Sequence, residues 1–146
     1  MKKLLMLVAP LLFMAGACAD DNDPDFRNRY FQGAEVLQLP TLQYDADGSP
    51  PDLRLDLKRS SVNFWEFSTN TRNDANRLPA YLSFSREVLA TDEFYELRLV
   101  DEDLGELSDD EIFFWEFQAV QDGTDGIIEF YGDNGELVLA LDYSLN

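Results

Sequence analysis

Hydrophobic and polar residues alternate along most of the chain after residue 33. In residues 52–59, leucine occupies positions 53, 55 and 57, and the charged residues Arg54, Asp56 and Lys58 lie between them. This period of two is typical of a β-strand with one buried face. Other segments show the same alternation or are rich in aromatic and β-branched residues. The expected strands are 34–40, 52–59, 61–68, 80–85, 93–100, 111–120, 126–132 and 136–143.

Turn residues separate these segments. Asn134-Gly135 lies between the last two and predicts a tight type I′ hairpin. The sequence QDGTDG, at 121–126, separates the sixth segment from the seventh. Eight short strands in residues 34–146 predict an all-β fold, either a β-sandwich or a barrel. Of the two, we expect an eight-stranded antiparallel β-sandwich.

One short motif occurs twice. NFWEF at 63–67 returns as FFWEF at 113–117. We interpret the two copies as core strands with similar packing needs. Nothing else repeats, so the sequence gives no sign of a solenoid.

Composition narrows the function classes. The chain has 146 residues, 45% of them hydrophobic, and a formal net charge of −18, so it can form one core but is repelled by nucleic acid. It contains no histidine, which removes the usual general base and the usual zinc ligand. We therefore expect no nucleic-acid partner and no enzymatic activity.

The first 17 residues have the features of an export signal. Lys2 and Lys3 precede an uncharged, mostly apolar run at 4–17, which is shorter than the roughly 20 residues of a membrane-spanning helix. Small residues at 15–17 then lead to Cys18, the only cysteine. Residues 1–17 thus resemble a bacterial lipoprotein signal peptide, although Ala15 stands where that pattern prefers leucine. The alternative is an ordinary secretory signal that happens to contain a cysteine.

The resemblance implies cleavage before Cys18 and lipidation of its thiol. The implied localisation is the bacterial cell envelope, with a lipid anchor in the outer membrane. Residues 18–33 are expected to form an acidic tether, whose ADDND segment resembles the export signal of surface lipoproteins in some Gram-negative bacteria. The periplasmic and the surface-exposed side both stay open.

Acidic residues are expected to gather at one end of the sandwich. Successive antiparallel strands reverse direction, so the connections at 41–52, 69–79, 101–110 and 132–135 should lie together. They carry the carboxylates Asp45, Asp47, Asp52, Asp101, Asp103, Asp109 and Asp110.

Such crowding suits a metal ion. Two carboxylates about 4 Å apart repel by about 4 kcal/mol near a protein surface, and a shared cation relieves this. Asp101 and Asp103 point the same way in an extended chain, and Gly105 lets the chain turn so that Asp109 returns to them. Hard oxygen ligands favour calcium over zinc. We predict a calcium site from Asp45, Asp47, Asp52, Asp101, Asp103 and Asp109, the alternative being acidic turns that are merely solvated.

An EF-hand does not fit these residues. With Asp101 at the first loop position, Glu106 falls where glycine is required and Ile112 falls where a bidentate glutamate belongs. The flanking segments are also expected strands, not helices.

The combination of eight expected strands with aspartates in the first and third connections resembles a C2-type calcium- and phospholipid-binding domain over residues 34–120. DEDLGELSD places Asp101, Asp103 and Asp109 at the spacing of that family's third-loop ligands, and SPPDLRLDL resembles its first-loop exit, carrying Asp52. TNTRNDANRLPAYLSFS resembles its second loop and the strand after it. The sequence departs from the family pattern in two respects: Asp52 follows Pro51 instead of preceding a proline, and no lysine-rich strand is evident. Either Asp45 or Asp47 could be the other first-loop ligand.

The expected protein is a cell-envelope lipoprotein whose C2-like domain is a non-enzymatic, calcium-binding module for a protein or a membrane. The alternative is a calcium-independent adhesin, inhibitor or assembly subunit. A hydrolase that uses two carboxylates is a third class, but no catalytic motif marks any Asp or Glu.

Overall fold

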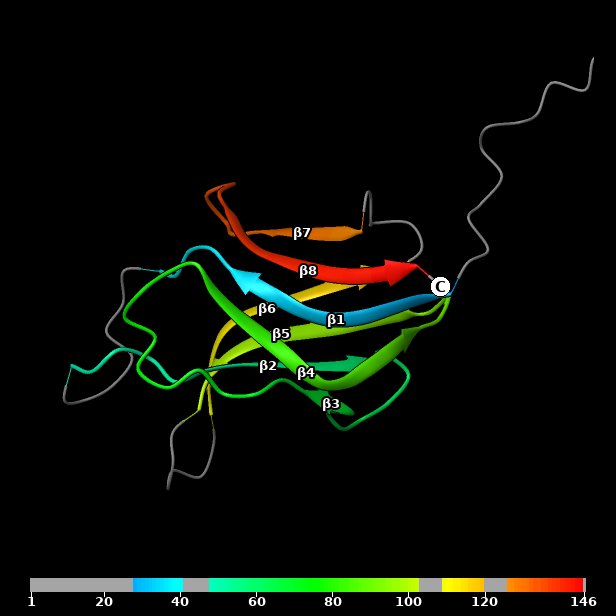
Figure 1. Cartoon of the computed structure of the whole chain (residues 1–146), viewed down its shortest axis with the longest axis horizontal. Helices are drawn as coiled ribbons and strands as arrows, with labels where there is room; N and C mark the ends of the chain where they lie inside the picture. Colours follow the sequence, from blue (N-terminus) through cyan, green and yellow to red (C-terminus); the bar gives the residue numbers. More distant parts are fainter. Residues whose placement is uncertain (1–27, 41–47, 103–108, 120–125, 146) are drawn as a thin grey trace, which may run out of the picture.

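The computed structural model describes residues 28–40, 48–102, 109–119 and 126–145. These residues form eight strands in two four-stranded antiparallel sheets, so the predicted eight-stranded β-sandwich is confirmed (Figure 1). The strands are β1 (Arg29–Val36), β2 (Leu53–Arg59), β3 (Phe67–Ser68), β4 (Ala80–Ala90), β5 (Phe94–Asp101), β6 (Asp110–Gln118), β7 (Ile127–Tyr131) and β8 (Leu137–Leu145).

The two sheets divide the strands evenly. One has the order β4-β1-β8-β7 and the other the order β3-β2-β5-β6. Each sheet therefore has two edge strands, and β3 approaches β4 along one flank through the isolated bridge between Thr69 and Phe84. β6 and β7 are the edge strands of the other flank.

The hydrophobic core lies between the sheets. The three leucines of β2 at 53, 55 and 57 are completely buried, as their alternation predicts. Phe31 on β1 packs edge-on against Tyr95 on β5, with ring centroids 5.5 Å apart, and Phe117 on β6 stacks on Tyr95 at 5.6 Å. Aromatic pairs of this geometry add about 1 kcal/mol each beyond the area they bury. The Phe31–Tyr95 pair joins the two sheets near the end where β1 begins.

The first strand begins earlier than the pattern predicts. Residues 29–33 belong to β1 and pair with β4 and β8, whereas we expected the first strand at 34–40. The register shifts between Phe31 and Gly33 in both ladders, and this irregularity breaks the alternation that would have identified the strand. Gly33 is needed there because a Cβ atom would lie 2.5 Å from the carbonyl oxygen of Leu82.

The first copy of the repeated motif is not a core strand, so that interpretation was wrong. Of the expected strand 61–68, only Phe67–Ser68 pairs as β3, and Phe64 is 67% exposed. The reason is a local ion pair that holds the preceding turn: Glu66 binds the Arg59 guanidinium, and its amide donates to the carbonyl of Leu57 at 3.2 Å. The second copy does lie within a strand, β6.

The last hairpin forms with a different turn. The amide of Gly135 donates to the carbonyl of Gly132 at 2.9 Å, and that of Gly132 donates to the carbonyl of Glu136 at 3.0 Å. Gly135 has a φ of 78°, but Asp74 is the one non-glycine residue with positive φ in the described ranges. A type I′ turn needs positive φ at both central residues, so the turn is instead type I followed by a left-handed glycine.

The connections share an end as predicted. The amide of Leu37 donates to the carbonyl of Val138 at 2.8 Å, and that of Glu102 to the carbonyl of Asp52 at 2.8 Å. In Figure 1 the described parts of these connections lie at the left, and β1 begins at the right, beside the end of β8. The chain therefore enters the sandwich at the end opposite to these loops.

Candidate metal-binding loop end

We call the described residues of the four clustered connections the loop end: 37–40, 48–52, 69–79, 101, 102, 109 and 132–136. Two predicted ligands meet there. The amide of Asp52 donates to Oδ1 of Asp101 at 2.6 Å, and the Asp101 side chain is almost completely buried at the end of β5. The structure thus joins the backbone of the first connection to a carboxylate of the third.

Backbone amides fix Asp52 from a second side. The amide of Asp74 donates to Oδ1 of Asp52 at 2.7 Å, and that of Ala75 donates to the carbonyl of Pro51 at 2.9 Å. Asp74 adopts a φ of 48°, a left-handed conformation that Asp and Asn tolerate better than most residues. The second connection therefore supports the carboxylate of the first, and the position of Asp52 is defined by both.

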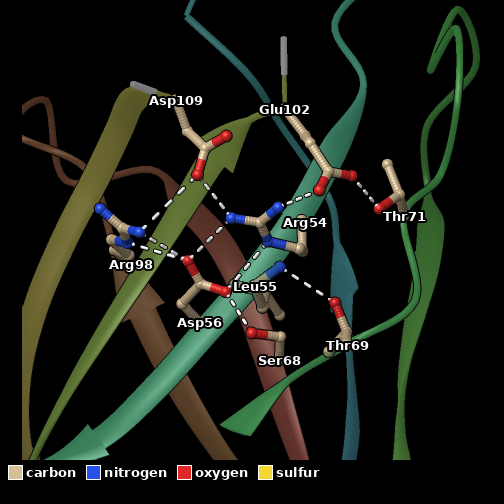
Figure 2. Close-up of polar contacts among 9 residues, drawn as sticks. All are labelled: Arg54, Leu55, Asp56, Ser68, Thr69, Thr71, Arg98, Glu102 and Asp109. Carbon is tan, nitrogen blue, oxygen red and sulfur yellow. Dashed lines mark hydrogen bonds and ion pairs between the residues drawn. The ribbon is translucent and has the colours of Figure 1, made fainter. Parts of the chain in front are cut away.

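Asp109 takes a different partner. Its Oδ2 accepts a hydrogen bond from Nη2 of Arg54 at 2.5 Å and lies 3.8 Å from Nη2 of Arg98 (Figure 2). Arg54 also binds Glu102, whose other oxygen accepts a hydrogen bond from the hydroxyl of Thr71. Guanidinium groups thus already supply positive charge to Asp109.

Asp56 is the anchor of this arginine network. It is 1% exposed on the outer face of its sheet, where it accepts hydrogen bonds from Nε of Arg54 at 3.0 Å and Nη2 of Arg98 at 2.8 Å. The Ser68 hydroxyl donates to it at 2.6 Å. Burial alone would raise the pKa of Asp56, but hydrogen bonds from Arg54, Ser68 and Arg98 outweigh burial and hold that pKa below its usual value.

Trp65 covers the same face. Its ring lies 4.4 Å from the guanidinium carbon of Arg98 and 5.3 Å from the ammonium of Lys58, and Lys58 pairs with Glu96 at 2.7 Å. Cation–π contacts of this kind contribute about 0.5–1 kcal/mol at exposed sites. The outer face of the β2–β5 pair is therefore an organised ionic layer that connects the loop end to the middle of the sheet.

The predicted ligands fall into three groups. The Asp52 backbone amide binds the Asp101 carboxylate, and Asp109 joins the arginine network. Asp45, Asp47 and Asp103 lie outside the described residues. Within the part of the chain that the structure describes, no group of three or more acidic or cysteine side chains could hold a metal ion. The donor chemistry of Asp52 and Asp101 fits calcium, because both offer hard carboxylate oxygens. The six-carboxylate site remains a prediction.

The sequence reasoning missed the arginine network. The alternation correctly put Arg54 and Asp56 on the polar face of β2, and such a face is normally solvated. The available signal was Arg98 on an expected neighbouring strand, since opposite charges directly across an antiparallel pair attract. Asp56 and Arg98 are indeed cross-strand partners.

No protein-family model matches the chain, and the comparison with curated proteins gave no match. Among solved structures, the chain is similar to human GIVD cytosolic phospholipase A2 in complex with methyl gamma-linolenyl fluorophosphonate inhibitor and terbium chloride. That likeness has a TM-score of 0.50 at 17% identity and covers 82% of this chain and 18% of the phospholipase. A second structure, of human GIVD cytosolic phospholipase A2 in complex with methyl gamma-linolenyl fluorophosphonate, has a TM-score of 0.48 at 17% identity, with coverages of 80% and 16%.

This chain thus spans less than a fifth of the phospholipase that it resembles, and the likeness concerns the fold alone. Together with the two four-stranded sheets, it supports the C2-like fold that the sequence predicts. No helix in the described ranges has the length and apolarity needed to cross a membrane.

Proposed function

We propose that the protein is a cell-envelope lipoprotein, anchored through Cys18, whose C2-like sandwich is a non-enzymatic binding module. Its loop end binds calcium through Asp52 and Asp101 with carboxylates of the neighbouring connections, Asp45 or Asp47 and Asp103. The cation neutralises these side chains and bridges them to an anionic group on a protein or lipid partner.

The observation that carries this proposal is the hydrogen bond from the backbone amide of Asp52 to the Asp101 carboxylate at the loop end. Their contact, 2.6 Å from amide to carboxylate, joins the two connections whose other acidic residues are the remaining predicted ligands. A net charge of −18 makes uncompensated crowding of the carboxylates in these connections costly. The similar phospholipase structure is a complex with terbium chloride, and terbium, like calcium, is a hard cation that binds oxygen ligands.

The direction of the chain favours a partner away from the anchoring membrane. Cys18 and Arg29 are 11 positions apart, which allows a tether of at most about 40 Å. β1 begins at the end opposite to the loop end, and strands of this length extend the sandwich by roughly 30 Å. A taut tether would thus hold the loop end well beyond the point where the chain leaves the membrane.

A second candidate is a calcium-independent interaction domain. The observation in its favour is the ion pair between Arg54 and Asp109, because an arginine there replaces the charge that a cation would supply. Calcium separates the two candidates. A cation that binds only the folded chain stabilises it by about 2.7 kcal/mol at a hundredfold excess over its dissociation constant, whereas the second candidate has one melting temperature with calcium and with chelator.

Anchoring is tested in a Gram-negative host that expresses the full-length chain. We expect the wild type to partition into detergent and Cys18→Ser to appear in the aqueous phase or as an unprocessed precursor. Ala19→Ser, a neighbouring change that keeps the thiol, should partition like the wild type. Equal partitioning of wild type and Cys18→Ser would contradict the anchor, and protease treatment of intact cells distinguishes the surface from the periplasm.

A further inference from the structure

The edge of one sheet offers a surface that the loop end does not use. β6 is the last strand of its sheet, and among the described residues it pairs with β5 alone. It has nine residues, DEIFFWEFQ, and contains neither proline nor lysine, the residues that commonly block edge strands. A register shift against β5 interrupts the ladder before Phe113, and from Phe113 to Gln118 the pairing is regular. The outer edge of this regular part presents backbone groups.

A cleft lies beside this edge. It separates β6 from β7, has a volume of about 360 Å³, and is lined in part by Trp115, Glu116, Glu129 and Tyr131. Nε1 of Trp115 donates to the carbonyl of Tyr131 at 3.1 Å and so fixes the spacing of the two strands. Apolar side chains border the flank, since Phe114 is 44% exposed and Tyr131 50% exposed.

The negative charge of the β6–β7 flank favours a positively charged partner over a second copy of the chain. Exposed carboxylates line both edge strands, and residues 110–118 and 127–131 contain no Lys or Arg. A second copy of the chain would place like charges opposite one another across the new ladder, which is unfavourable, and each copy has a net charge of −18. The exposed carboxylates are Asp110, Glu111, Glu116 and Glu129.

We propose that β6 binds an extended basic segment of a partner protein, which adds to the sheet as a fifth strand. Alternate residues of an added strand face opposite sides. On the outer side, Lys or Arg side chains would lie beside Glu116 and over the ring of Phe114. On the inner side, apolar side chains would enter the cleft beside Trp115 and Tyr131. Main-chain hydrogen bonds give this mode its affinity and the alternate pockets its specificity.

The test uses the full-length chain and two capped octapeptides, one with four Lys-Val repeats and one with four Glu-Val repeats. Calorimetry should detect binding of the lysine peptide and none of the glutamate peptide. Hydrogen exchange should then slow for backbone amides of β6 and stay unchanged in β4, the edge strand of the opposite flank. Equal binding of both peptides, binding of neither, or protection confined to β4 would each overturn the proposal.

Charge reversal supplies the matched variants. Glu116→Lys in β6 should weaken the lysine peptide by about tenfold, because one attraction becomes a repulsion. Glu87→Lys makes the same change at an exposed position of β4 and should bind like the wild type. Glu111→Lys repeats the test if Glu116→Lys does not fold, as judged by its melting curve. Equal weakening by Glu87→Lys would reduce the effect to net charge and refute a site at β6.

Discussion

Replacing Asp56 by asparagine tests whether the arginine network stabilises the fold. Asparagine keeps the size of the side chain and one oxygen acceptor, but it removes the negative charge. Its amide group would donate toward Arg54 or Arg98, which are themselves donors only. The variant therefore leaves two guanidinium groups facing a neutral side chain at a position that is 1% exposed.

The magnitude follows from the contacts. Breaking a buried ion pair by removing one partner costs about 3–5 kcal/mol. The loss here should be smaller, because the Arg54 and Arg98 side chains are 16% and 19% exposed and can gain water. Arg54 also keeps Glu102 and Asp109. We expect a loss of about 2–3 kcal/mol, or roughly 8–12 °C in melting temperature for a domain of this size.

Urea denaturation followed by tryptophan fluorescence measures this loss. Asp92→Asn is the matched control, since Asp92 is exposed and accepts one hydrogen bond, from Gln118 at 2.8 Å, which asparagine can still accept. We expect the control to lie within about 0.5 kcal/mol of the wild type. A loss below about 0.5 kcal/mol for Asp56→Asn would show that the network is only a surface arrangement.

Three further outcomes are expected. The pKa of Asp56 is lower in the folded state than its ordinary value of 3.8. The ionised side chain therefore contributes fully to the free energy of unfolding well above pH 3.8, and this contribution is lost as the pH falls through the folded-state pKa. Stability should fall less steeply with acid in Asp56→Asn than in the wild type, and parallel curves would contradict this. Trp65→Ala should cost about 1 kcal/mol through Arg98 and Lys58, whereas Phe64→Ala, at a residue that is 67% exposed, should stay within about 0.5 kcal/mol in chemical denaturation. Gly33→Ala should cost about 1–3 kcal/mol, because its Cβ would lie 2.5 Å from a backbone oxygen; an unchanged melting temperature would show that β4 yields at no cost.

The sequence predicted the sandwich because most strands bury one face. Where Leu53, Leu55 and Leu57 alternate with charged residues, the strand bounds agree with the structure to within a residue. Prediction failed where a local interaction overrides the pattern. In β1 an irregular register hides the period, and at 61–66 the Arg59–Glu66 pair holds an aromatic motif out of the core.

The loop end could be predicted only in part for a similar reason. Strand count alone placed the four connections together, and the contact between Asp52 and Asp101 agrees with that reasoning. The spacing of acidic residues within a loop cannot reveal that a guanidinium group from elsewhere in the chain supplies the positive charge. Arg54 on β2 reaches Asp109, which directly precedes β6, across 55 positions of sequence. The two come together only because β5 pairs with both β2 and β6.

Calcium titration by calorimetry tests the central claim most directly. For the full-length chain we expect saturable binding at the loop end, with an affinity that falls at least tenfold in Asp103→Asn, because one ligand charge is lost. Asp133→Asn removes one charge from the same loop end, in the β7–β8 turn, and should bind calcium like the wild type. No heat of binding in the wild type, or an equal decrease in both variants, would contradict a calcium site and leave the acidic connections as solvated turns.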